Sequence, residues 1–467
     1  MSIFGHYISR GAIMLTVVEA LIFGSVFLLF GYFLLGGVRG ETIVDFAMDV
    51  ALPTGIVMIC LLVAGGYRLE AWKSPRTMAR RVAGGAVGGS AAIVFFHDVM
   101  TGAGSVSYNL VVAVIVGCLI ACAGRWISGR SRRVQNYLDR KVLVLGTGQQ
   151  AATLNAVLKS DRVSSVSFAG FLHHSQELDA TAAVDGQLSK EDILQTDMQL
   201  ADYAALFGIK EIVVALDSTS QGLPERALLD CRLRGISVVD SISFIERETG
   251  RIGLDSVDLR WLVFSPGFRY GRARTAIKRL CDVMISSILL ILLAPAMLAT
   301  VLAVRWDSPG PAVFKQTRVG LGGKAFIMYK FRSMRQDAEA DGKARWAVTN
   351  DNRITKIGHV LRMSRLDELP QLYNVLRGDM SLVGPRPERP EFVEGLSQQI
   401  PFYNERHSVR PGITGWAQTS FSYASSIEDT KTKLEYDLYY VKNHSLFLDI
   451  LVLLQTLRVA VRGEGAR

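Results

Sequence analysis

Residues 366–371 read Leu-Asp-Glu-Leu-Pro-Gln, and residues 381–387 read Ser-Leu-Val-Gly-Pro-Arg-Pro. Proline is tolerated only in the first turn of a helix, so Pro370 predicts that Asp367 and Glu368 lie at or just inside a helix N-terminus. Adjacent helical positions point about 100° apart, so one carboxylate can face a phosphorus atom while the other holds a metal. Capping of the helix by the two acids is the simpler alternative.

Basic residues and rigid turns surround the two acids. Arg362 lies five residues before Asp367, and Arg386 lies between two prolines, in a turn suited to aiming one guanidinium group. Cations beside carboxylates suit chemistry on phosphates, in which the cations hold the substrate and a carboxylate attacks it or binds a metal. The candidate substrate-binding residues are Lys330, Arg332, Arg362, Pro385, Arg386, Pro387 and Arg410. The sequence contains no Walker motif, no G-x-S-x-G motif and no His/Cys metal cluster.

The composition indicates a membrane protein with a basic C-terminal part. Hydrophobic residues make up 49% of the 467 residues, and they are clustered. Residues 260–467 hold 30 Lys and Arg against 19 Asp and Glu, whereas residues 1–259 hold 22 against 24. The basic part should therefore meet an anionic partner, either phosphates, anionic lipid or nucleic acid. The five cysteines lack metal-binding spacing, which is typical of a reducing compartment.

Residues 1–130 are predicted to form a bundle of four transmembrane helices. Apolar stretches cover residues 12–35, 44–66, 82–100 and 106–124. Basic residues are concentrated between the second and third stretches and after the fourth, so the positive-inside rule predicts both ends of the bundle in the cytoplasm. Glu19 lies within the first stretch, either as a functional intramembrane acid or as a packed polar contact.

Residues 131–265 are predicted to form a Rossmann-like α/β domain with a parallel sheet. Buried strands are expected from residue 141 and at residues 165–172 and 211–216, with helices around residues 201–207 and 224–234. Gly146 and Gly148 belong to a G-x-G-x-x-A pattern that can bind a dinucleotide pyrophosphate at a helix N-terminus. Because no ribose-binding acid follows the second strand at the expected place, a ligand-free or regulatory domain is favoured and no cofactor site is assigned.

Residues 283–304 form an apolar run of 22 residues with basic residues on both sides. Pro295 lies in the middle of this run, where it removes a backbone hydrogen bond and kinks the helix. Because both flanks are basic, neither side is favoured for export. A helix over residues 280–305 that enters the membrane, bends at Pro295 and returns keeps both flanks in the cytoplasm. A fifth full span is the alternative.

The rest of the chain is predicted to complete a mixed α/β catalytic domain over residues 270–467. After residue 307 the sequence alternates short apolar pieces with Gly and Pro turns. Residues 445–462 form an amphipathic helix, which either lies on the membrane surface or closes the core of the domain.

These motifs together resemble the bacterial sugar transferase family, the polyprenyl-phosphate hexose-1-phosphate transferases of the monotopic phosphoglycosyl transferase superfamily. The upstream bundle and α/β domain resemble the long, undecaprenyl-phosphate glucose phosphotransferase-like members. The motifs that carry the resemblance are Lys278-Arg279-x-x-Asp282, Pro295, Lys330–Met334, Leu366–Gln371, Gly378–Ser381, Val383–Pro387, Pro411–Gln418 and Tyr436–Tyr440. The resemblance implies a re-entrant membrane hairpin, to which Lys278, Arg279, Asp282 and Pro295 belong, and a cytoplasmic catalytic domain.

The resemblance also implies an activity. A hexose-1-phosphate, with glucose as the first choice and galactose as the alternative, passes from a UDP-sugar to undecaprenyl phosphate, and UMP is released. Asp367 corresponds to the nucleophile of a covalent phospho-sugar intermediate, and Glu368 helps it to hold Mg²⁺. Arg362 and Arg386 correspond to ligands of the donor phosphates, and Asp437 is a further substrate-binding candidate.

The implied partners are the UDP-sugar, undecaprenyl phosphate and the lipid bilayer, without nucleic acid, and self-association is left open. The implied location is the bacterial inner membrane, at the first membrane step of exopolysaccharide or O-antigen repeat-unit assembly. In the apolar run, Ala294-Pro295 stands where many small members of the family have Ser-Pro, so no serine hydrogen bond is expected there.

Two other functions remain open at this stage. A membrane-bound, NAD-dependent nucleotide-sugar dehydratase or epimerase would also join membrane spans to a Gly-x-Gly α/β unit, with its chemistry near Gly146. A sensory or scaffold membrane protein would use the α/β domain to bind a ligand.

Overall fold

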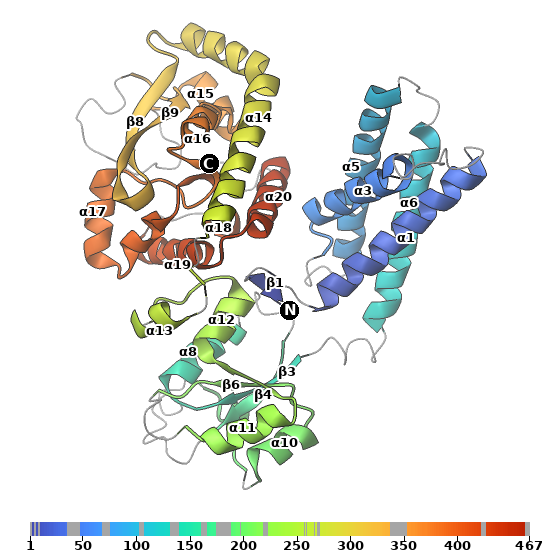
Figure 1. The fold of residues 1–467 in the computed structure, drawn as a ribbon, viewed down its shortest axis with the longest axis vertical. Coiled ribbons are helices and arrows are strands. Elements are labelled where there is room, and N and C mark those ends of the chain that lie inside the picture. The colour runs from blue at the N-terminus through green and yellow to red at the C-terminus, as the bar shows by residue number, and fades with distance from the viewer. Residues whose placement is uncertain are drawn as a thin grey trace. The chain divides into compact units, whose positions relative to one another are not determined.

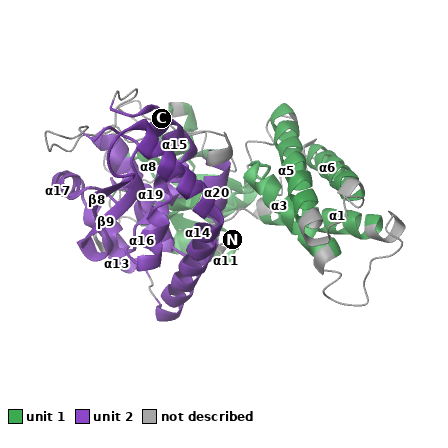
Figure 2. Ribbon diagram, turned by 90° about the horizontal axis from the view of Figure 1, so that it is seen from above, with its two compact units in different colours: residues 1–3, 7–249 green, residues 4–6, 250–467 purple. Residues whose placement is uncertain are grey.

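The computed structural model divides into two compact units, Met1–Ile3 with Tyr7–Thr249, and Phe4–His6 with Gly250–Arg467 (Figure 2). It describes residues 2–3, 6–7, 10–34, 47–67, 75–101, 107–130, 140–159, 166–173, 188–196, 198–217, 223–255, 257, 259–265, 267–268, 271–336, 353–421 and 426–462. Short strands β1 (Ser2–Ile3) and β2 (His6–Tyr7) pair near the N-terminus.

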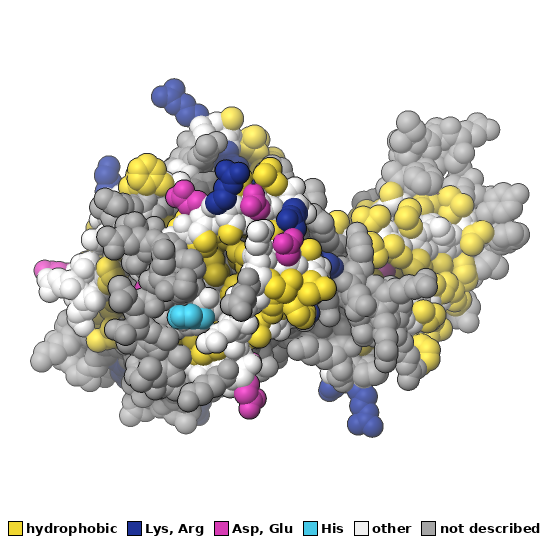
Figure 3. All heavy atoms as spheres, turned by 90° about the horizontal axis from the view of Figure 1, so that it is seen from below, with side chains coloured by type: hydrophobic (Ala, Val, Ile, Leu, Met, Phe, Trp, Pro, Cys, Tyr) yellow, Lys and Arg dark blue, Asp and Glu magenta, His cyan; other side chains and the backbone are white. Residues whose placement is uncertain are grey.

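An apolar helical bundle forms the first part of the first unit (Figure 1). Its described helices are α1 (Arg10–Leu34), the π-helical turn η1 (Ala47–Ala51), α3 (Leu52–Val63), α5 (Pro75–Thr101) and α6 (Ser107–Arg130). Phe23, Val57 and Val114 are buried where these helices pack together. Large apolar side chains also cover the outside of the bundle, for example Leu21 and Leu119 (Figure 3). An apolar exterior of this kind suits lipid better than water.

Three helices in the described part of the chain are long and apolar enough to cross a membrane. They contain Ile13–Phe30 in α1, Asn109–Ser128 in α6, and Arg272–Asp307 further along the chain. The apolar helix Asp49–Val63 is shorter. A membrane protein is therefore supported, while the count of four spans in the bundle stays a prediction.

Glu19, the acid within the first apolar stretch, is a packed polar contact in this structure. Arg125 of α6 donates from Nε to Glu19 Oε1 at 2.5 Å and from Nη2 to Glu19 Oε2 at 2.8 Å. Arg125 Nη1 also donates to the carbonyl of Gly66 at 2.9 Å. Each buried charge thus has a hydrogen-bonded partner, which is the condition for keeping charges away from water.

The α/β domain contains a parallel sheet, as the sequence predicts, and the structure gives its strand order as β5-β4-β3-β6-β7. Its strands are β3 (Arg140–Leu145), β4 (Val166–Leu172), β5 (Ile193–Leu194), β6 (Glu211–Val214) and β7 (Ser237–Asp240). Its helical segments are α8 (Gln149–Leu158), η2 (Lys190–Asp192), α10 (Leu200–Leu206), α11 (Glu225–Leu233) and α12 (Ser241–Thr249). Val142 and Val144 face one core with α8 and α12, whereas Leu143 and Leu145 face the other with α10 and α11. A strand covered on both faces has to be apolar throughout, which explains the continuous run in β3.

The N-terminus of α8 is occupied by a carboxylate of the chain itself. Asp217, which follows β6, accepts hydrogen bonds from the backbone N–H groups of Gln149 at 2.6 Å and Gln150 at 2.8 Å. A Cβ atom on Gly148 would lie 2.0 Å from Asp217 Oδ2, so the glycine is required for this close approach. The two donors that a pyrophosphate would need are therefore already engaged.

The second unit contains the long helix α14 and a mixed α/β domain. Its first described helix is α13 (Leu259–Phe264), and α14 (Arg272–Asp307) is one continuous helix with Pro295 inside it. The elements that follow are β8 (Val313–Val319), η3 (Leu321–Gly323), β9 (Ala325–Phe331), α15 (Lys356–Ser364), η4 (Leu366–Glu368), α16 (Gln371–Arg377), β10 (Ser381–Val383), α17 (Pro390–Gln399), η5 (Tyr403–Ser408), β11 (Gly412–Thr414), α18 (Trp416–Ser420), α19 (Ile427–Asn443) and α20 (Leu446–Arg462). β8 and β9 pair antiparallel, and β10 and β11 pair parallel.

Both ends of α14 pack against the same domain. Near its N-terminal end, Arg279 donates to the carbonyls of Val375 and Leu376 in α16. Near its C-terminal end, Val304 is buried with Phe331 and Leu361. Figure 1 shows the helix curving between these two attachments. Helix α20 does not separate apolar from polar side chains as expected: Leu448 and Val452 are buried together with Asp449, while the apolar Ile450 and Leu457 are exposed.

We expect Asp217→Ala to loosen the first turn of α8, because two backbone donors lose their acceptor. By analogy with the loss of an N-cap side chain, the free energy of unfolding should fall by about 1 kcal/mol. Amide hydrogen exchange on the full-length protein should show faster exchange over residues 149–152 and unchanged exchange in β7. Unchanged protection of the α8 N-terminus would contradict this role for Asp217.

Candidate active site

The two acids of the quoted stretch lie in a tight turn between two helices. Helix α15 ends at Ser364, and Arg365 adopts a left-handed conformation with φ of 57°. The 3₁₀ turn η4 (Leu366–Glu368) follows, and Pro370 precedes the first residue of α16. The acids thus lie one turn before the helix rather than inside its first turn. The left-handed residue reverses the chain, and both acidic side chains are buried.

Glu368 is bound by cations from two distant segments. Its Oε1 accepts a hydrogen bond from Lys330 Nζ of β9 at 3.2 Å and another from Arg386 Nη2 at 3.0 Å. Arg365 Nη1 lies 3.8 Å from its Oε2. Burial alone would raise the pKa of Glu368, but the positive charges of Arg386, Lys330 and Arg365 outweigh it and hold the pKa well below its usual range. Glu368 is therefore ionised at neutral pH.

Asp367 has the opposite environment. Only 8% of the residue is exposed, and among the described residues no hydrogen bond or salt bridge engages its carboxylate. Burial and the neighbouring charge of Glu368 raise the pKa of Asp367, while Lys330, Arg362 and Arg386 oppose that rise. A carboxylate that is desolvated, near cations and free of a bonded partner is available to attack an electrophile or to bind a cation.

The Pro-Arg-Pro turn holds Arg386 over this pair. Strand β10 ends at Val383, and Gly384 packs so closely against the chain after Arg410 that a Cβ atom there would lie 2.3 Å from the Arg410 carbonyl. The N–H of Gly412 donates to the carbonyl of Pro385 at 2.9 Å. The turn is thus fixed by β11, which supports the sequence prediction that it aims one guanidinium group.

The structure brings together Asp367, Glu368, Lys330 and Arg386, with Arg362 close enough to affect the pKa of Asp367. Arg362 projects from α15 and donates from Nε to Ser333 Oγ at 3.0 Å. Ser333 and Arg365 were not singled out from the sequence. Arg365 could have been, because it lies beside the acids, whereas Ser333 is placed by tertiary structure alone.

Three other predicted substrate-binding residues have intramolecular roles here. Arg332 donates to the carbonyls of Ser308 and Pro309 after α14, at 2.6 and 2.9 Å. Arg410 donates to the carbonyl of Gly378 at 3.0 Å. Asp437 is 1% exposed and accepts from Arg406 Nη2 at 2.6 Å. These contacts join elements of the domain, and the structure does not bring the three side chains to the acidic pair.

The predicted hairpin residues Lys278 and Asp282 join α14 to β10, the strand that leads into the Pro-Arg-Pro turn. Lys278 Nζ donates to Asp449 Oδ2 at 2.7 Å and to the carbonyl of Val383 at 3.3 Å. Asp282 accepts from the N–H of Leu382 at 3.2 Å. The membrane helix is therefore attached directly to β10, the strand before Arg386.

Mg²⁺ fits the chemistry of the acidic pair. The described residues contain no group of three or more His, Cys, Asp or Glu side chains that could hold a metal alone. Mg²⁺, however, is commonly bound by one or two carboxylates together with substrate phosphates and water. Asp367 and Glu368 are the residues that would hold it, with the remaining positions left to a diphosphate.

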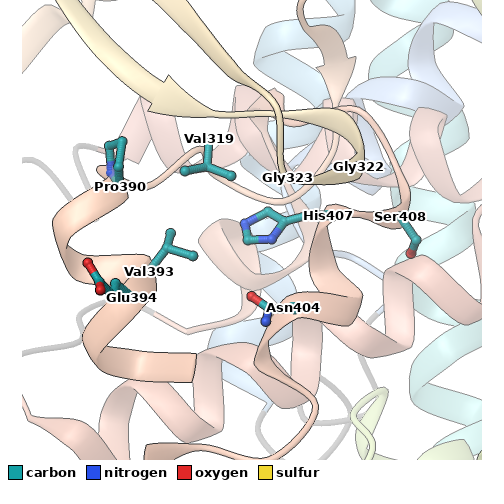
Figure 4. Close-up of a pocket in the computed structure, with 9 residues that line it drawn as sticks. All are labelled: Val319, Gly322, Gly323, Pro390, Val393, Glu394, Asn404, His407 and Ser408. Carbon is teal, nitrogen blue, oxygen red and sulfur yellow. The ribbon is translucent and has the colours of Figure 1, made fainter. Parts of the chain in front are cut away.

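A hollow of about 540 Å³ lies at the tip of the β8–β9 hairpin, between η3, α17 and η5. It is lined by Val319, Gly322, Gly323, Pro390, Val393, Glu394, Asn404, His407 and Ser408 (Figure 4). Burial and the nearby Arg406 charge lower the pKa of His407 to about 4, so the imidazole is neutral at physiological pH. None of the predicted catalytic or substrate-binding residues lines this hollow.

Most of the chain can be aligned with bacterial sugar transferases. The family model described as "Bacterial sugar transferase" matches residues 273–463. A UDP-glucose:undecaprenyl-phosphate glucose-1-phosphate transferase of Xanthomonas campestris pv. campestris is 31% identical over 434 residues, which are 90% of this chain and 87% of that protein.

Two further relatives match over shorter regions. A UDP-N-acetylgalactosamine-undecaprenyl-phosphate N-acetylgalactosaminephosphotransferase of Aeromonas hydrophila is 43% identical over 277 residues, 58% of this chain. That match covers 64% of the Aeromonas protein, less than two thirds of its length. A UDP-glucose:undecaprenyl-phosphate glucose-1-phosphate transferase of Escherichia coli (strain K12) is 42% identical over 182 residues, 38% of this chain and 39% of that protein. The chain belongs to the bacterial sugar transferase family.

Proposed function

We propose that this protein transfers a hexose-1-phosphate from a UDP-sugar to undecaprenyl phosphate and releases UMP. The observation that carries the proposal is the contrast between the two adjacent acids. Glu368 is ionised and bound by Lys330 and Arg386, whereas the neighbouring Asp367 carboxylate is buried and has no bonded partner within the described part of the chain. One acid is thus used to organise cations, and the other is available as a nucleophile.

The transfer takes place in two displacements at the same phosphorus atom. An Asp367 carboxylate oxygen attacks the β-phosphorus of the UDP-sugar, and the bond from that phosphorus to the bridging oxygen breaks, so that UMP leaves. The product is a phospho-sugar bound to Asp367 as an acyl phosphate. A phosphate oxygen of undecaprenyl phosphate then attacks this phosphorus and displaces the Asp367 carboxylate, which leaves a diphosphate-linked lipid sugar.

The cations of the site let these anions meet. A dianionic donor approaching two carboxylates is repelled unless positive groups are fixed in place beforehand. Lys330 and Arg386 are held by Glu368, and Arg362 lies on the other side of the turn on α15. When bound, Mg²⁺ would add positive charge where negative charge develops on the transferring phosphate. No residue of this set has to move a proton, because both attacking groups are already anions.

Glucose is the proposed sugar, with galactose as the alternative. The Xanthomonas and Escherichia relatives are named as glucose-1-phosphate transferases, whereas the Aeromonas relative is named for N-acetylgalactosamine. Exopolysaccharide or O-antigen repeat-unit assembly is the proposed setting, and the bacterial inner membrane is the proposed location. The rival NAD-dependent function is not favoured, because Asp217 takes the α8 donors that a dinucleotide would need.

The proposed topology is a re-entrant α14. Ser286 and Thr300 are buried in the structure, and exposed apolar side chains lie between them and on both sides of them, for example Met284, Ile291 and Leu302. Both ends of α14 also contact one domain, which supports keeping them on the same, cytoplasmic side. The basic residues on both flanks then lie at anionic headgroups, where each Lys or Arg contributes about 1 kcal/mol to membrane binding.

The covalent scheme predicts release of UMP before any lipid is present. Incubation with UDP-sugar alone should give a stoichiometric burst of UMP, and Asp367→Asn should reduce it on the order of a thousandfold or more. Glu391→Gln, an exposed acid on α17, serves as the control and should keep the burst. Comparing UDP-glucose, UDP-galactose and UDP-N-acetylgalactosamine should give the largest burst with UDP-glucose. A strict requirement for lipid phosphate before UMP appears would exclude the covalent intermediate.

The acid limb of the pH–rate profile should report the ionisation of Asp367. The carboxylate attacks only when ionised, so the rate falls as the pH drops through the raised pKa of Asp367. Lys330→Met removes the positive charge that lowers the pKa of Asp367 most, so this pKa should rise further. The acid limb of the kcat/KM profile should then move to higher pH. Lys324→Met, on the same hairpin with an exposed side chain, should leave the limb in place. A limb that stays or moves to lower pH in Lys330→Met would contradict this assignment.

The re-entrant model predicts that both ends of α14 are reached from one side. Single cysteines at Ala276 and Thr317, in a chain without its native cysteines, should react with an impermeant reagent from the cytoplasmic face of oriented vesicles. Pro295→Leu should restore the missing backbone hydrogen bond, shift the segment towards spanning and reduce activity. Labelling of the two positions from opposite faces of the membrane would end the re-entrant model.

A further inference from the structure

The backbone carbonyls of four consecutive residues, 385 to 388, are each held by a donor from another segment. The N–H of Gly412 donates to Pro385 and the N–H of Val319 donates to Glu388, both at 2.9 Å. Between them, Arg406 Nη2 donates to the carbonyl of Arg386 at 3.0 Å, and Arg318 Nη1 donates to the carbonyl of Pro387 at 3.0 Å. Pro385 and Pro387 have no N–H group, so hydrogen bonds can fix the backbone of these two residues only through their carbonyl oxygens.

The two central donors are arginine side chains that are themselves held in place. Arg406 is 3% exposed, donates from Nη1 to Tyr403 Oη at 2.8 Å and pairs with Asp437 at 2.6 Å. Arg318 donates from Nε and Nη2 to Gln316 Oε1 at 3.0 and 2.6 Å.

A carboxylate of the turn itself also joins this arrangement. Glu388 Oε2 lies 3.6 Å from Arg318 Nη1, and Glu388 Oε1 accepts from Lys433 Nζ of α19 at 2.7 Å. Burial alone would raise the pKa of Glu388, but Lys433, Arg406 and Arg318 lower it to about 2. A planar guanidinium group has several N–H donors in a fixed geometry. Some of them can therefore bind a side chain that fixes the arginine, while another donates to a carbonyl of the turn.

The side chain of Arg386 depends on this arrangement. About a third of it is exposed, and it forms an ion pair with Glu368 at 3.0 Å. Because packing leaves the guanidinium partly open, the backbone of the turn must set where it lies relative to Asp367 and Glu368. A displacement of about 1 Å at such a group can cost a factor of about a hundred in rate.

We infer that Arg318 and Arg406 are positioning residues for the transfer, which act by holding the carbonyls of the Pro-Arg-Pro turn so that Arg386 meets Glu368 and the donor phosphates. Asp437 takes part by holding Arg406, and not by contacting substrate. This inference rests on the proposed function, because it takes Arg386 to bind the donor.

A double-mutant cycle between Arg318 and Arg386 tests the inference on the full-length protein in membranes. The readout is kcat/KM for UDP-glucose in UMP release, normalised to folded protein. Arg318→Gln should lower kcat/KM about tenfold when Arg386 is present, and less than about twofold in an Arg386→Ala background. If Arg386→Ala is too slow to measure, Arg386→Lys provides the background. Lys324→Gln removes a charge from the same hairpin and should have no effect in either background.

A role in stability alone predicts a different result, because a destabilised fold loses the same factor whether or not Arg386 is present. Equal losses in the two backgrounds, or no loss in Arg318→Gln, would overturn the inference. Wild-type kcat/KM in Arg386→Ala would instead show that the proposed role of Arg386 is wrong. Arg406→Lys provides a second cycle, since one ammonium group cannot reproduce the fork between Tyr403, Asp437 and the Arg386 carbonyl, and it should show the same non-additivity.

Discussion

Glu368 can stay ionised inside the domain only because two cations from distant parts of the chain meet at one of its oxygens. Removing either cation from a buried pair of this kind usually costs several kcal/mol, because the remaining charge is left without compensation. The β8–β9 hairpin must therefore bring Lys330, and the Pro-Arg-Pro turn must bring Arg386, to the same place. Once both cations are fixed on Glu368, the adjacent Asp367 lies among positive charges without being bonded to them. The site is thus prepared for an anionic substrate before that substrate arrives.

The α/β domain satisfies a helix N-terminus from within the chain. Asp217 supplies a carboxylate to the first N–H groups of α8, and Gly148 makes room for it. The Gly-x-Gly pattern in the sequence reports only that some oxygen atom approaches the backbone closely at this turn. A pyrophosphate and an aspartate carboxylate meet that requirement equally, so the pattern alone could not separate a cofactor site from an internal contact.

Local sequence rules predicted what depends on local geometry. Strands β3, β4 and β6 follow from short apolar runs, whereas β5 and β7 were not predicted. Pro370 correctly indicated a helix start close to the two acids, but the acids lie in the turn before that helix. The pairing of Asp367 and Glu368 with Lys330 and Arg386 was expected as a group, because these residue types suit phosphate chemistry. The roles of Arg332, Arg410 and Asp437 were not visible, since a buried arginine–carbonyl or arginine–carboxylate contact is decided by tertiary packing. Arg318 and Arg406 carry no motif of their own for the same reason, and their partners lie 69 and 20 residues away.

The attachment of α14 to β10 connects the membrane to the chemistry. In the proposed reaction, a soluble sugar nucleotide and a lipid phosphate have to reach Asp367, so the height of the site above the bilayer could not vary freely. Lys278 and Asp282 of α14 bind Val383 and Leu382, and Gly384 then starts the turn that contains Arg386. Tyr440 of α19 and Asp449 of α20 reinforce this junction, because Tyr440 Oη lies 2.6 Å from Asp449 Oδ1 and 3.0 Å from the Val383 carbonyl oxygen and can donate its one proton to either. Only Gly384 and Pro385 thus separate Val383, which a side chain of α14 contacts, from Arg386, whose guanidinium group meets Glu368. A tilt of α14 therefore acts directly on the strand that leads into the Pro-Arg-Pro turn, as well as on α16.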